Sequence, residues 1–251
     1  MSQPFRLNKE GLINRNKKIS FTFNGKKLFG YEGDTIASAL IANGIHLVGR
    51  SFKYHRPRGF FGAGVEEPNA KLQVEFNGHS EPNVNATEME LVEGLSATSQ
   101  NCWPSVNFDI GAINNFLKMF FPAGFYYKTF MWPKSFWYKI YEPFIRKAAG
   151  LGVASIEKDK ERYEHKFEYC DLLVTGSGPS GLASAYAAAK NGAKVILAED
   201  KPRFGGTLLT DDVSIDNLSG KDWAEKIITE LKSMPNVTVK NRSQVFGYYD
   251  H

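Results

Sequence analysis

Hydrophobic and polar residues alternate in the N-terminal third of the chain in a way typical of β-hairpins. Residues 19–23 alternate, Asn24-Gly25 supplies the two positive-φ residues of a type I′ turn, and residues 28–31 return. The alternation over residues 72–75 before Asn77-Gly78 predicts a second hairpin. A sheet built from hairpins is therefore expected in this part of the chain.

A helix is predicted between the hairpins, over residues 35–43, with Asp34 as its N-cap and Gly44 as its left-handed end. Hairpin, helix and further hairpin indicate a ferredoxin-like β-grasp domain. A ferredoxin of this type carries C-x4-C-x2-C in the loop after the helix, whereas residues 45–64 contain no cysteine. We expect no iron–sulfur cluster here, and no metal site elsewhere in the chain.

The next segment is polar and then strongly aromatic. Residues 95–105 are turn-rich and predict a connection that runs over the surface. Residues 116–144 hold 13 of the 34 aromatic residues, so we expect another domain or subunit to cover them. Pro122, Pro133 and Pro143 divide this stretch into helical pieces too short to cross a membrane. Its most prominent rings are Phe120, Phe121, Tyr126, Tyr127, Trp132, Phe136, Trp137, Tyr138 and Tyr141.

The C-terminal part begins with a strand, a turn and a helix. The apolar run 172–175 precedes a G-x-G-x-x-G motif, and an alanine-rich stretch follows it. Gly176 allows the tight turn, Gly178 lets a pyrophosphate approach the backbone, and Gly181 lets the helix lie close to the strand. The order predicts a Rossmann-type dinucleotide-binding unit.

A second predicted strand, residues 194–198, ends in Glu199, 18 residues beyond Gly181. A carboxylate there accepts hydrogen bonds from the adenosine ribose and repels a 2′-phosphate, which favours NAD or FAD over NADP. A helix over residues 223–232 and a strand over 237–239 continue the unit. The other candidate nucleotide-binding residues are Pro179, Ser180, Asp200, Gly205, Gly206 and Thr207.

Composition places the chain among globular proteins. The elements predicted above place it in a mixed α/β and α+β class. Its 251 residues are 42% hydrophobic, and its net charge of +4 is spread among alternating acids and bases, so nucleic acid is not an expected partner. No run of 18 apolar residues occurs, and we expect a cytoplasmic protein without membrane contact. We expect a β-grasp domain over residues 1–100, a connecting segment over 101–165, and a dinucleotide domain over 166–251 that is truncated on its C-terminal side.

The most basic stretch, residues 49–59, alternates cations with aromatic rings. Arg50, Arg56 and Arg58 could grip a phosphate, stack on aromatic rings at a subunit contact, or form a solvated loop. His55 among them is expected to be a surface or packing residue.

The two cysteines, Cys102 and Cys170, are expected to be reduced and buried. No acid–base partner stands at a recognisable spacing from Cys102, and we assign no catalytic residue.

Residues 49–59, 100–105, 108–112 and 176–181 together resemble the N-terminal part of the α subunits of heterotetrameric sarcosine oxidases, over essentially the whole chain. The resemblance implies NAD on the glycine turn, FMN at the contact with the β subunit, and FAD in the β subunit, with γ and δ subunits completing the complex. It implies oxidative demethylation of sarcosine to glycine with hydrogen peroxide, and methylenetetrahydrofolate formed on a C-terminal tetrahydrofolate-binding domain absent here. This part alone is expected to be inactive.

Alternatives remain open. Opine oxidases and hydrogen cyanide synthase share a similar N-terminal arrangement, although the missing cluster cysteines favour sarcosine oxidase. A stand-alone FAD-dependent NAD(P)H oxidoreductase would use the same fingerprint for FAD. A docking module formed by the β-grasp and aromatic segments would bind its partner tightly even with Gly178 replaced by a bulky residue. The motif does not separate NAD from FAD, because both present the same adenosine diphosphate to the turn.

Overall fold

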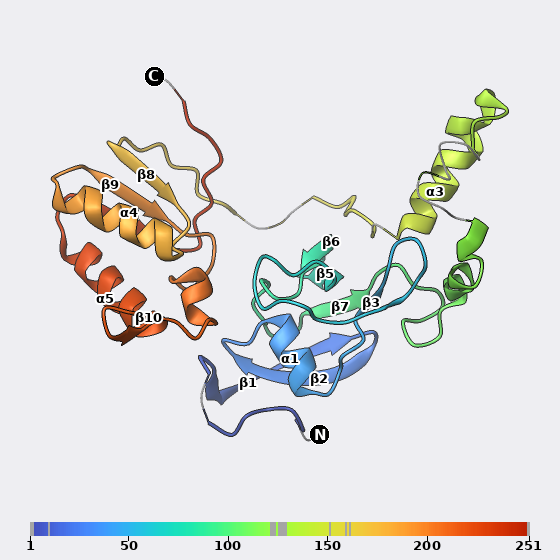
Figure 1. Cartoon of the computed structure of the whole chain (residues 1–251), viewed down its shortest axis with the longest axis horizontal. Coiled ribbons are helices and arrows are strands. Elements are labelled where there is room, and N and C mark those ends of the chain that lie inside the picture. The colour runs from blue at the N-terminus through green and yellow to red at the C-terminus, as the bar shows by residue number, and fades with distance from the viewer. Residues whose placement is uncertain are drawn as a thin grey trace. The chain divides into compact units, whose positions relative to one another are not determined.

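The structure, a computed structural model, describes residues 3–9, 11–120, 124, 130–150, 152–158, 160 and 162–249. The chain forms two compact units, Met1–Arg162 and Tyr163–His251, and each has its own hydrophobic core (Figure 1). In the aromatic segment, Phe121, Pro122, Tyr126, Tyr127 and Lys128 lie outside the described residues.

The first unit is built on a five-stranded mixed sheet of order β2-β1-β7-β5-β6, and a separate ladder pairs β3 with β4. Helix α1 (Ile36–Ala42) contributes four of its buried residues to the core of this unit. The strands are β1 (Asn14–Phe23), β2 (Lys26–Glu32), β3 (Gly49–Arg50), β4 (Pro57–Arg58), β5 (Lys71–Phe76), β6 (His79–Asn85) and β7 (Ser96–Ser99).

Both predicted hairpins are confirmed. The β1–β2 turn has φ of 48° at Asn24 and 76° at Gly25, and the β5–β6 turn has φ of 51° at Asn77 and 80° at Gly78. These positive angles are what the two Asn-Gly pairs predict.

The centre of the sheet is a strand that the sequence analysis missed. The expectation of a surface connection over residues 95–105 is wrong for β7, which pairs parallel to β1 and antiparallel to β5. Only four residues long, β7 carries small or hydroxylated side chains, so its pattern looks like a turn. Ala97 is nevertheless buried, and β7 is the middle strand of the five.

The cap of α1 lies one residue later than predicted. Thr35 is the N-cap, and its side chain accepts a hydrogen bond from the Ser38 N–H. The carboxylate of Asp34 is instead buried, where it accepts two 2.7 Å hydrogen bonds from the Arg6 guanidinium and one from the Tyr31 N–H at 2.8 Å. Gly44 has φ of 79°, as expected after a helix end.

The described residues between 110 and 149 form short helical pieces, in agreement with the prediction from the prolines. They are η1 (Ile110–Asn115), η2 (Lys118–Phe120), η3 (Lys134–Phe136), the π-helix η4 (Trp137–Tyr141) and α3 (Glu142–Ala149). Among the described residues, no helix is long and apolar enough to span a bilayer.

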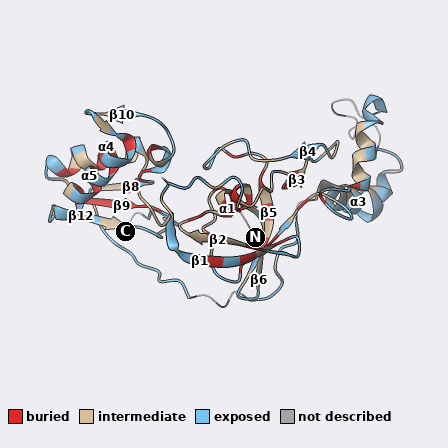
Figure 2. Ribbon diagram, turned by 90° about the horizontal axis from the view of Figure 1, so that it is seen from below, coloured by how far each residue is buried: buried red, intermediate tan, exposed pale blue. Residues whose placement is uncertain are grey.

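The second unit holds a three-stranded parallel sheet of order β12-β9-β8, one half of a doubly wound fold. All four residues of β9 are buried (Figure 2), and α4 and α5 share one core with the sheet. Its elements are β8 (Leu172–Thr175), α4 (Pro179–Lys190), β9 (Val195–Ala198), η5 (Gly206–Leu209), β10 (Ser214–Ile215), β11 (Leu218–Ser219), α5 (Gly220–Ser233) and β12 (Val237–Lys240). The predicted β-grasp and Rossmann-type folds are thus confirmed.

A buried carboxylate organises the loop between β4 and β5. Glu67 is 1% exposed and accepts hydrogen bonds from four backbone N–H groups, those of Phe61, Gly62, Asn69 and Ala70. Burial alone raises the pKa of Glu67, but the four donors outweigh burial and hold the pKa below its ordinary value of 4.5.

We expect Glu67→Gln to lower the free energy of unfolding at pH 7 by about 2 kcal/mol, because an amide leaves buried N–H groups without an acceptor. The lowered pKa means that the ionised group stabilises the fold above about pH 4.5, and that this stabilisation is lost as the pH falls through the folded-state pKa. Thermal unfolding at pH 7 and pH 3 measures both effects. Glu66→Gln, at the exposed neighbouring carboxylate, is the matched control and should cost less; equal losses at both positions would contradict the assignment.

Candidate functional site

The glycine turn joins β8 to α4 with the geometry that its three glycines predict. Gly176 has φ of 91°, a conformation that favours glycine. A Cβ added at Gly181 would lie 2.1 Å from the Gly176 carbonyl oxygen, so only glycine allows the helix to approach this closely. A Cβ added at Gly178 would meet nothing within 4 Å, which leaves open space beside the backbone.

The N-terminus of α4 faces this space without a capping side chain. Gly178 is the N-cap, Pro179 is the first helical residue, and the first turn contains no acidic residue. Free N–H groups and the positive end of the helix dipole form an anion-binding site. Pro179 and Ser180 are exposed at this end of the helix.

Glu199 follows the end of β9, the strand next to β8, and its carboxylate is buried. One oxygen accepts hydrogen bonds from the Ser177 N–H at 2.8 Å and from the Ser177 hydroxyl, and the other accepts one from the Lys201 N–H at 3.1 Å. Glu199 also shares a side-chain hydrogen bond with the neighbouring Asp200.

Asp200 lies beside Glu199 and is exposed. Partial burial raises the pKa of Asp200, but hydrogen bonds with Glu199 and the Lys201 ammonium lower the pKa overall. The pair places carboxyl groups at the end of β9, where they would repel a phosphate on the ribose 2′ position.

Ser177, which was not among the predicted site residues, connects Glu199 to Gly205 by hydrogen bonds. It is fully buried, its hydroxyl donates to Glu199, and the Gly205 N–H lies 3.1 Å from both its hydroxyl and its carbonyl oxygen. The residue occupies a variable position of the G-x-G-x-x-G motif, so no sequence signal could have identified it.

The paired glycines, Gly205 and Gly206, lie against the glycine turn. Gly206 has φ of 53°, and a Cβ added there would lie 2.9 Å from the Gly178 Cα atom. Thr207 follows in η5 and is exposed. All ten predicted residues therefore gather around the carboxyl ends of β8 and β9, where doubly wound folds bind ligands. The open Gly178, the uncapped helix and the fixed Glu199 fit an adenosine diphosphate group.

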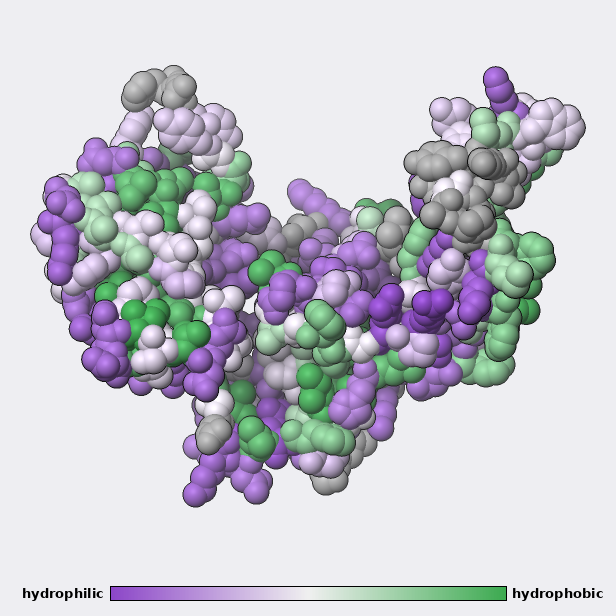
Figure 3. All heavy atoms as spheres, in the orientation of Figure 1, coloured by the Kyte–Doolittle hydropathy of each residue, from purple (hydrophilic) through white to green (hydrophobic). Residues whose placement is uncertain are grey.

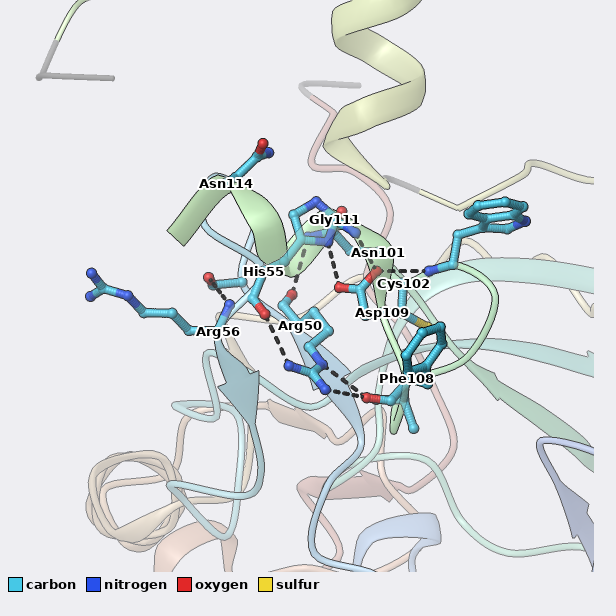
Figure 4. A network of polar contacts seen from close by, with 12 residues as sticks. Arg50, His55, Arg56, Asn101, Cys102, Phe108, Asp109, Gly111 and Asn114 are labelled. Atoms are coloured by element: carbon cyan, nitrogen blue, oxygen red, sulfur yellow. Dashed lines mark hydrogen bonds and ion pairs between the residues drawn. The ribbon is translucent and has the colours of Figure 1, made fainter. Parts of the chain in front are cut away.

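A second polar network joins the basic loop to residues 102–115 (Figure 4). The Arg50 guanidinium donates to the carbonyl oxygens of Val106 at 2.7 and 2.8 Å, Asn107 at 3.4 Å and His55 at 3.1 Å. Backbone oxygens occupy most donors of this guanidinium, and the interpretation of Arg50 as a phosphate ligand stays a prediction.

His55 and Asp109 form the centre of this network. Asp109 Oδ2 lies 2.7 Å from His55 Nδ1, and Oδ1 accepts hydrogen bonds from the N–H groups of Trp103 at 3.0 Å and Gly111 at 3.1 Å. Arg56 donates to Asn115 at 3.0 Å, and its guanidinium lies 4.9 Å from the Tyr54 ring centroid. Intrachain contacts hold the loop, and whether it binds a phosphate or a subunit or is only solvated stays open. His55 is bound to Asp109 within the chain, and its expected role as a surface or packing residue stays a prediction.

The cysteines are less buried than expected. Both are free and only half-buried, and Cys102 lies beside the Asp109 network. Burial and the Asp109 charge raise the pKa of Cys102, although Arg50 opposes this. A raised pKa disfavours the thiolate, so Cys102 is not an activated nucleophile.

Comparisons with known proteins agree with both units. Residues 16–102 match the family of 2Fe-2S iron-sulfur cluster binding domains, and residues 171–238 match the family of FAD dependent oxidoreductases. Over 246 residues the chain is 56% identical to the sarcosine oxidase subunit alpha of Rhizobium meliloti (strain 1021). These residues make up 98% of this chain and 25% of that protein. The chain is thus similar to a sarcosine oxidase α subunit over nearly its whole length.

A second relative, the sarcosine oxidase subunit alpha of Corynebacterium sp. (strain U-96), is 32% identical over 100% of this chain and 22% of its own length. The chain thus spans about a quarter of the length of the curated relatives that it matches, in their N-terminal part. A crystal structure of L-proline dehydrogenase from P. horikoshii shares the fold, with a TM-score of 0.53, 19% identity, and coverage of 96% of this chain and 35% of that one.

The match to cluster-binding domains does not extend to the cluster ligands. Residues 16–102 contain one cysteine, Cys102, whereas a [2Fe–2S] cluster of this type is held by four thiolates. Among the described residues, no three His, Cys, Asp or Glu side chains are grouped so as to hold a metal ion. The first unit is thus similar to these domains, but its described residues offer no set of ligands that fits a cluster.

The turn geometry predicts that two glycine-to-alanine substitutions change the free energy of unfolding by different amounts. Gly181→Ala should lower the free energy of unfolding by about 2 kcal/mol or more, because the methyl group overlaps the Gly176 carbonyl. Gly178→Ala should change it by less than about 1 kcal/mol, because its φ of −65° suits alanine and its methyl group meets open space. Chemical denaturation of both variants measures the difference, and equal stabilities would contradict the described turn.

Proposed function

We propose that the chain binds NAD through its adenosine diphosphate half, with the pyrophosphate at the N-terminus of α4 and the ribose at Glu199. The observation that carries the proposal is the open space at Gly178, bordered by uncapped helix N–H groups and by a buried carboxylate held in place by Ser177. Pro179, Ser180, Gly206 and Thr207 would border the pyrophosphate, and Asp200 would disfavour a 2′-phosphate.

We further propose that the whole protein is the α subunit of a sarcosine oxidase, assembled with β, γ and δ subunits. The identity of 56% over nearly the entire chain supports this assignment. The assembled enzyme would demethylate sarcosine to glycine with oxygen as acceptor, and would produce hydrogen peroxide and methylenetetrahydrofolate. FMN and FAD would supply the redox chemistry in the complex, and the residues described here would bind and orient NAD. No residue of this chain is assigned to the chemical step.

FAD is the second candidate ligand for the glycine turn. The match of residues 171–238 to FAD dependent oxidoreductases supports it, and FAD presents the same adenosine diphosphate.

We expect the full-length protein, purified natively and then denatured, to release NAD in near-stoichiometric amount, identified by mass spectrometry. Gly178→Ala should release little or none, because the added methyl group occupies the space of the pyrophosphate. Gly49→Ala, whose Cβ makes only 3.9 Å contacts away from the turn, is the matched control and should release as much as the unchanged protein. Release of FAD would establish the second candidate, and equal release from both variants would remove Gly178 from the site.

The role of Glu199 is tested by affinity. In the full-length protein, Glu199→Gln should weaken ADP-ribose binding by about 1.5 kcal/mol, about tenfold, because an amide is a poorer acceptor for the ribose hydroxyls. The loss should be smaller for the 2′-deoxy analogue, which lacks one of those hydroxyls. Asp200→Asn, at the exposed neighbour, should have the smaller effect. Equal losses for both ligands would place the ribose elsewhere.

The sarcosine assignment is tested on the complete assembly by measuring hydrogen peroxide released with sarcosine. We expect peroxide formation with sarcosine and little with glycine, the product of demethylation. Activity that requires a different amine would retain the nucleotide site and contradict the substrate.

A further inference from the structure

The chain contains four Asn-Gly dipeptides, which begin at Asn24, Asn43, Asn77 and Asn191. In such a dipeptide the glycine nitrogen can attack the side-chain carbonyl carbon of the asparagine, because glycine has no side chain to block the approach. The attack requires an asparagine side chain that is free to turn and a glycine N–H that is not already hydrogen-bonded. The hydrogen bonds at the four dipeptides therefore determine which of them reacts.

Two of the dipeptides lie at helix ends and are held at both reacting groups. The N–H of Gly44 donates to a carbonyl oxygen three residues earlier at 2.8 Å, and that of Gly192 does the same at 3.0 Å. The side-chain amides donate to carbonyl oxygens four residues earlier, at 2.7 Å for Asn43 and 2.8 Å for Asn191. Both dipeptides are therefore protected.

The other two dipeptides form the β-hairpin turns, and their backbones match. The angle φ is 48° at Asn24 and 51° at Asn77, and 76° and 80° at the following glycines. The Asn24 side chain donates to the Ser99 hydroxyl at 3.0 Å and accepts from the Ser99 N–H at 2.8 Å, so both of its polar atoms are fixed. Within the part of the chain that the structure describes, the Asn77 side chain makes no hydrogen bond. Asn77 is thus free to turn toward Gly78.

The turn at Asn77 is open to water and lies beside a cation. Asn77 and Gly78 are exposed, and Figure 3 shows mostly hydrophilic residues over the part of the first unit that holds β5 and β6. A Cβ added at Gly78 would lie 3.4 Å from the Lys160 ammonium nitrogen. A nearby positive charge favours both the deprotonated nitrogen and a carboxylate product.

We propose that Asn77 is a site of spontaneous deamidation through Gly78, favoured by Lys160. The Gly78 nitrogen gives up its proton and forms a bond to the side-chain carbonyl carbon of Asn77. The bond from that carbon to the amide nitrogen breaks, and the proton leaves with it as ammonia. Water then opens the resulting succinimide at either carbonyl, which leaves aspartate or isoaspartate. The step needs no oxidant, and the proposal does not depend on which nucleotide the glycine turn binds.

The first test incubates the full-length protein at neutral and at mildly alkaline pH and follows each Asn-Gly peptide by mass spectrometry. Asn77 should lose ammonia at least about tenfold faster than Asn24, because Asn24 must first break its hydrogen bonds to Ser99. The rate at Asn77 should rise with pH, and labelling by an isoaspartyl methyltransferase should appear in its peptide. Equal rates at Asn77 and Asn24, or faster loss at Asn43 or Asn191, would overturn the proposal.

The second test releases the Asn24 side chain. Ser99→Ala removes the hydroxyl that accepts from Asn24 and should speed deamidation there several-fold. Thr98→Ala removes a hydroxyl from the exposed neighbouring residue and is the matched control. Unchanged rates at Asn43 and Asn191 in the same samples separate this local release from general unfolding. An unchanged rate at Asn24 would contradict the protection that we assign to Ser99.

The third test concerns the cation. Lys160→Gln should slow deamidation at Asn77 about twofold, since the interaction lies at the surface. Lys158→Gln, at another exposed lysine of the same segment, should leave the rate unchanged. Equal rates in the two variants would overturn the role of Lys160.

Discussion

The candidate nucleotide site depends on one buried carboxylate. Burying the charge of Glu199 is costly unless donors surround it, and here Ser177 and Lys201 supply three. The Ser177 hydroxyl also accepts a hydrogen bond from the Gly205 N–H. Glu199, the glycine turn and the loop that contains Gly205 therefore hold one another in position. The groups of Ser177 and Lys201 that offset the cost of burying Glu199 thus also define the shape of the site. The stability of the fold and the geometry of the site therefore depend on the same hydrogen bonds.

The first unit uses the same device at other places. Glu67 accepts hydrogen bonds from four backbone N–H groups in the loop that precedes β5, and Asp109 accepts them from those of Trp103 and Gly111. In ferredoxins of this fold, thiolate ligation of a cluster organises the loop after the helix. Here an ionised side chain provides comparable order in a nearby loop without a metal, so a β-grasp domain with a single cysteine in its matched range keeps a defined structure.

Much of this fold could be predicted because its signals are local. Asn24-Gly25 and Asn77-Gly78 determine their own turns, and the glycines of the motif are required by backbone geometry that neighbouring residues cannot supply. The rest depends on contacts distant in sequence. Strand β7 has no pattern of its own and is a strand because β1 and β5 pair with it. Ser177 is important only because Glu199, 22 residues away, folds onto it.

The basic loop shows why charge alone does not reveal how a loop is held in a fold. Arginines at Arg50 and Arg56 suggested phosphate binding, yet Arg50 is 56 residues from the Val106 carbonyl that it binds, and no local pattern connects them. Guanidinium groups that satisfy buried carbonyl oxygens allow adjacent backbone to be rigid without a hydrophobic filling. Apolar side chains of the same segment are then free to face outward. The network of Arg50, His55 and Asp109 thus holds the backbone at Val106, Trp103 and Gly111 from within, while rings such as those of Trp103 and Phe108 are exposed.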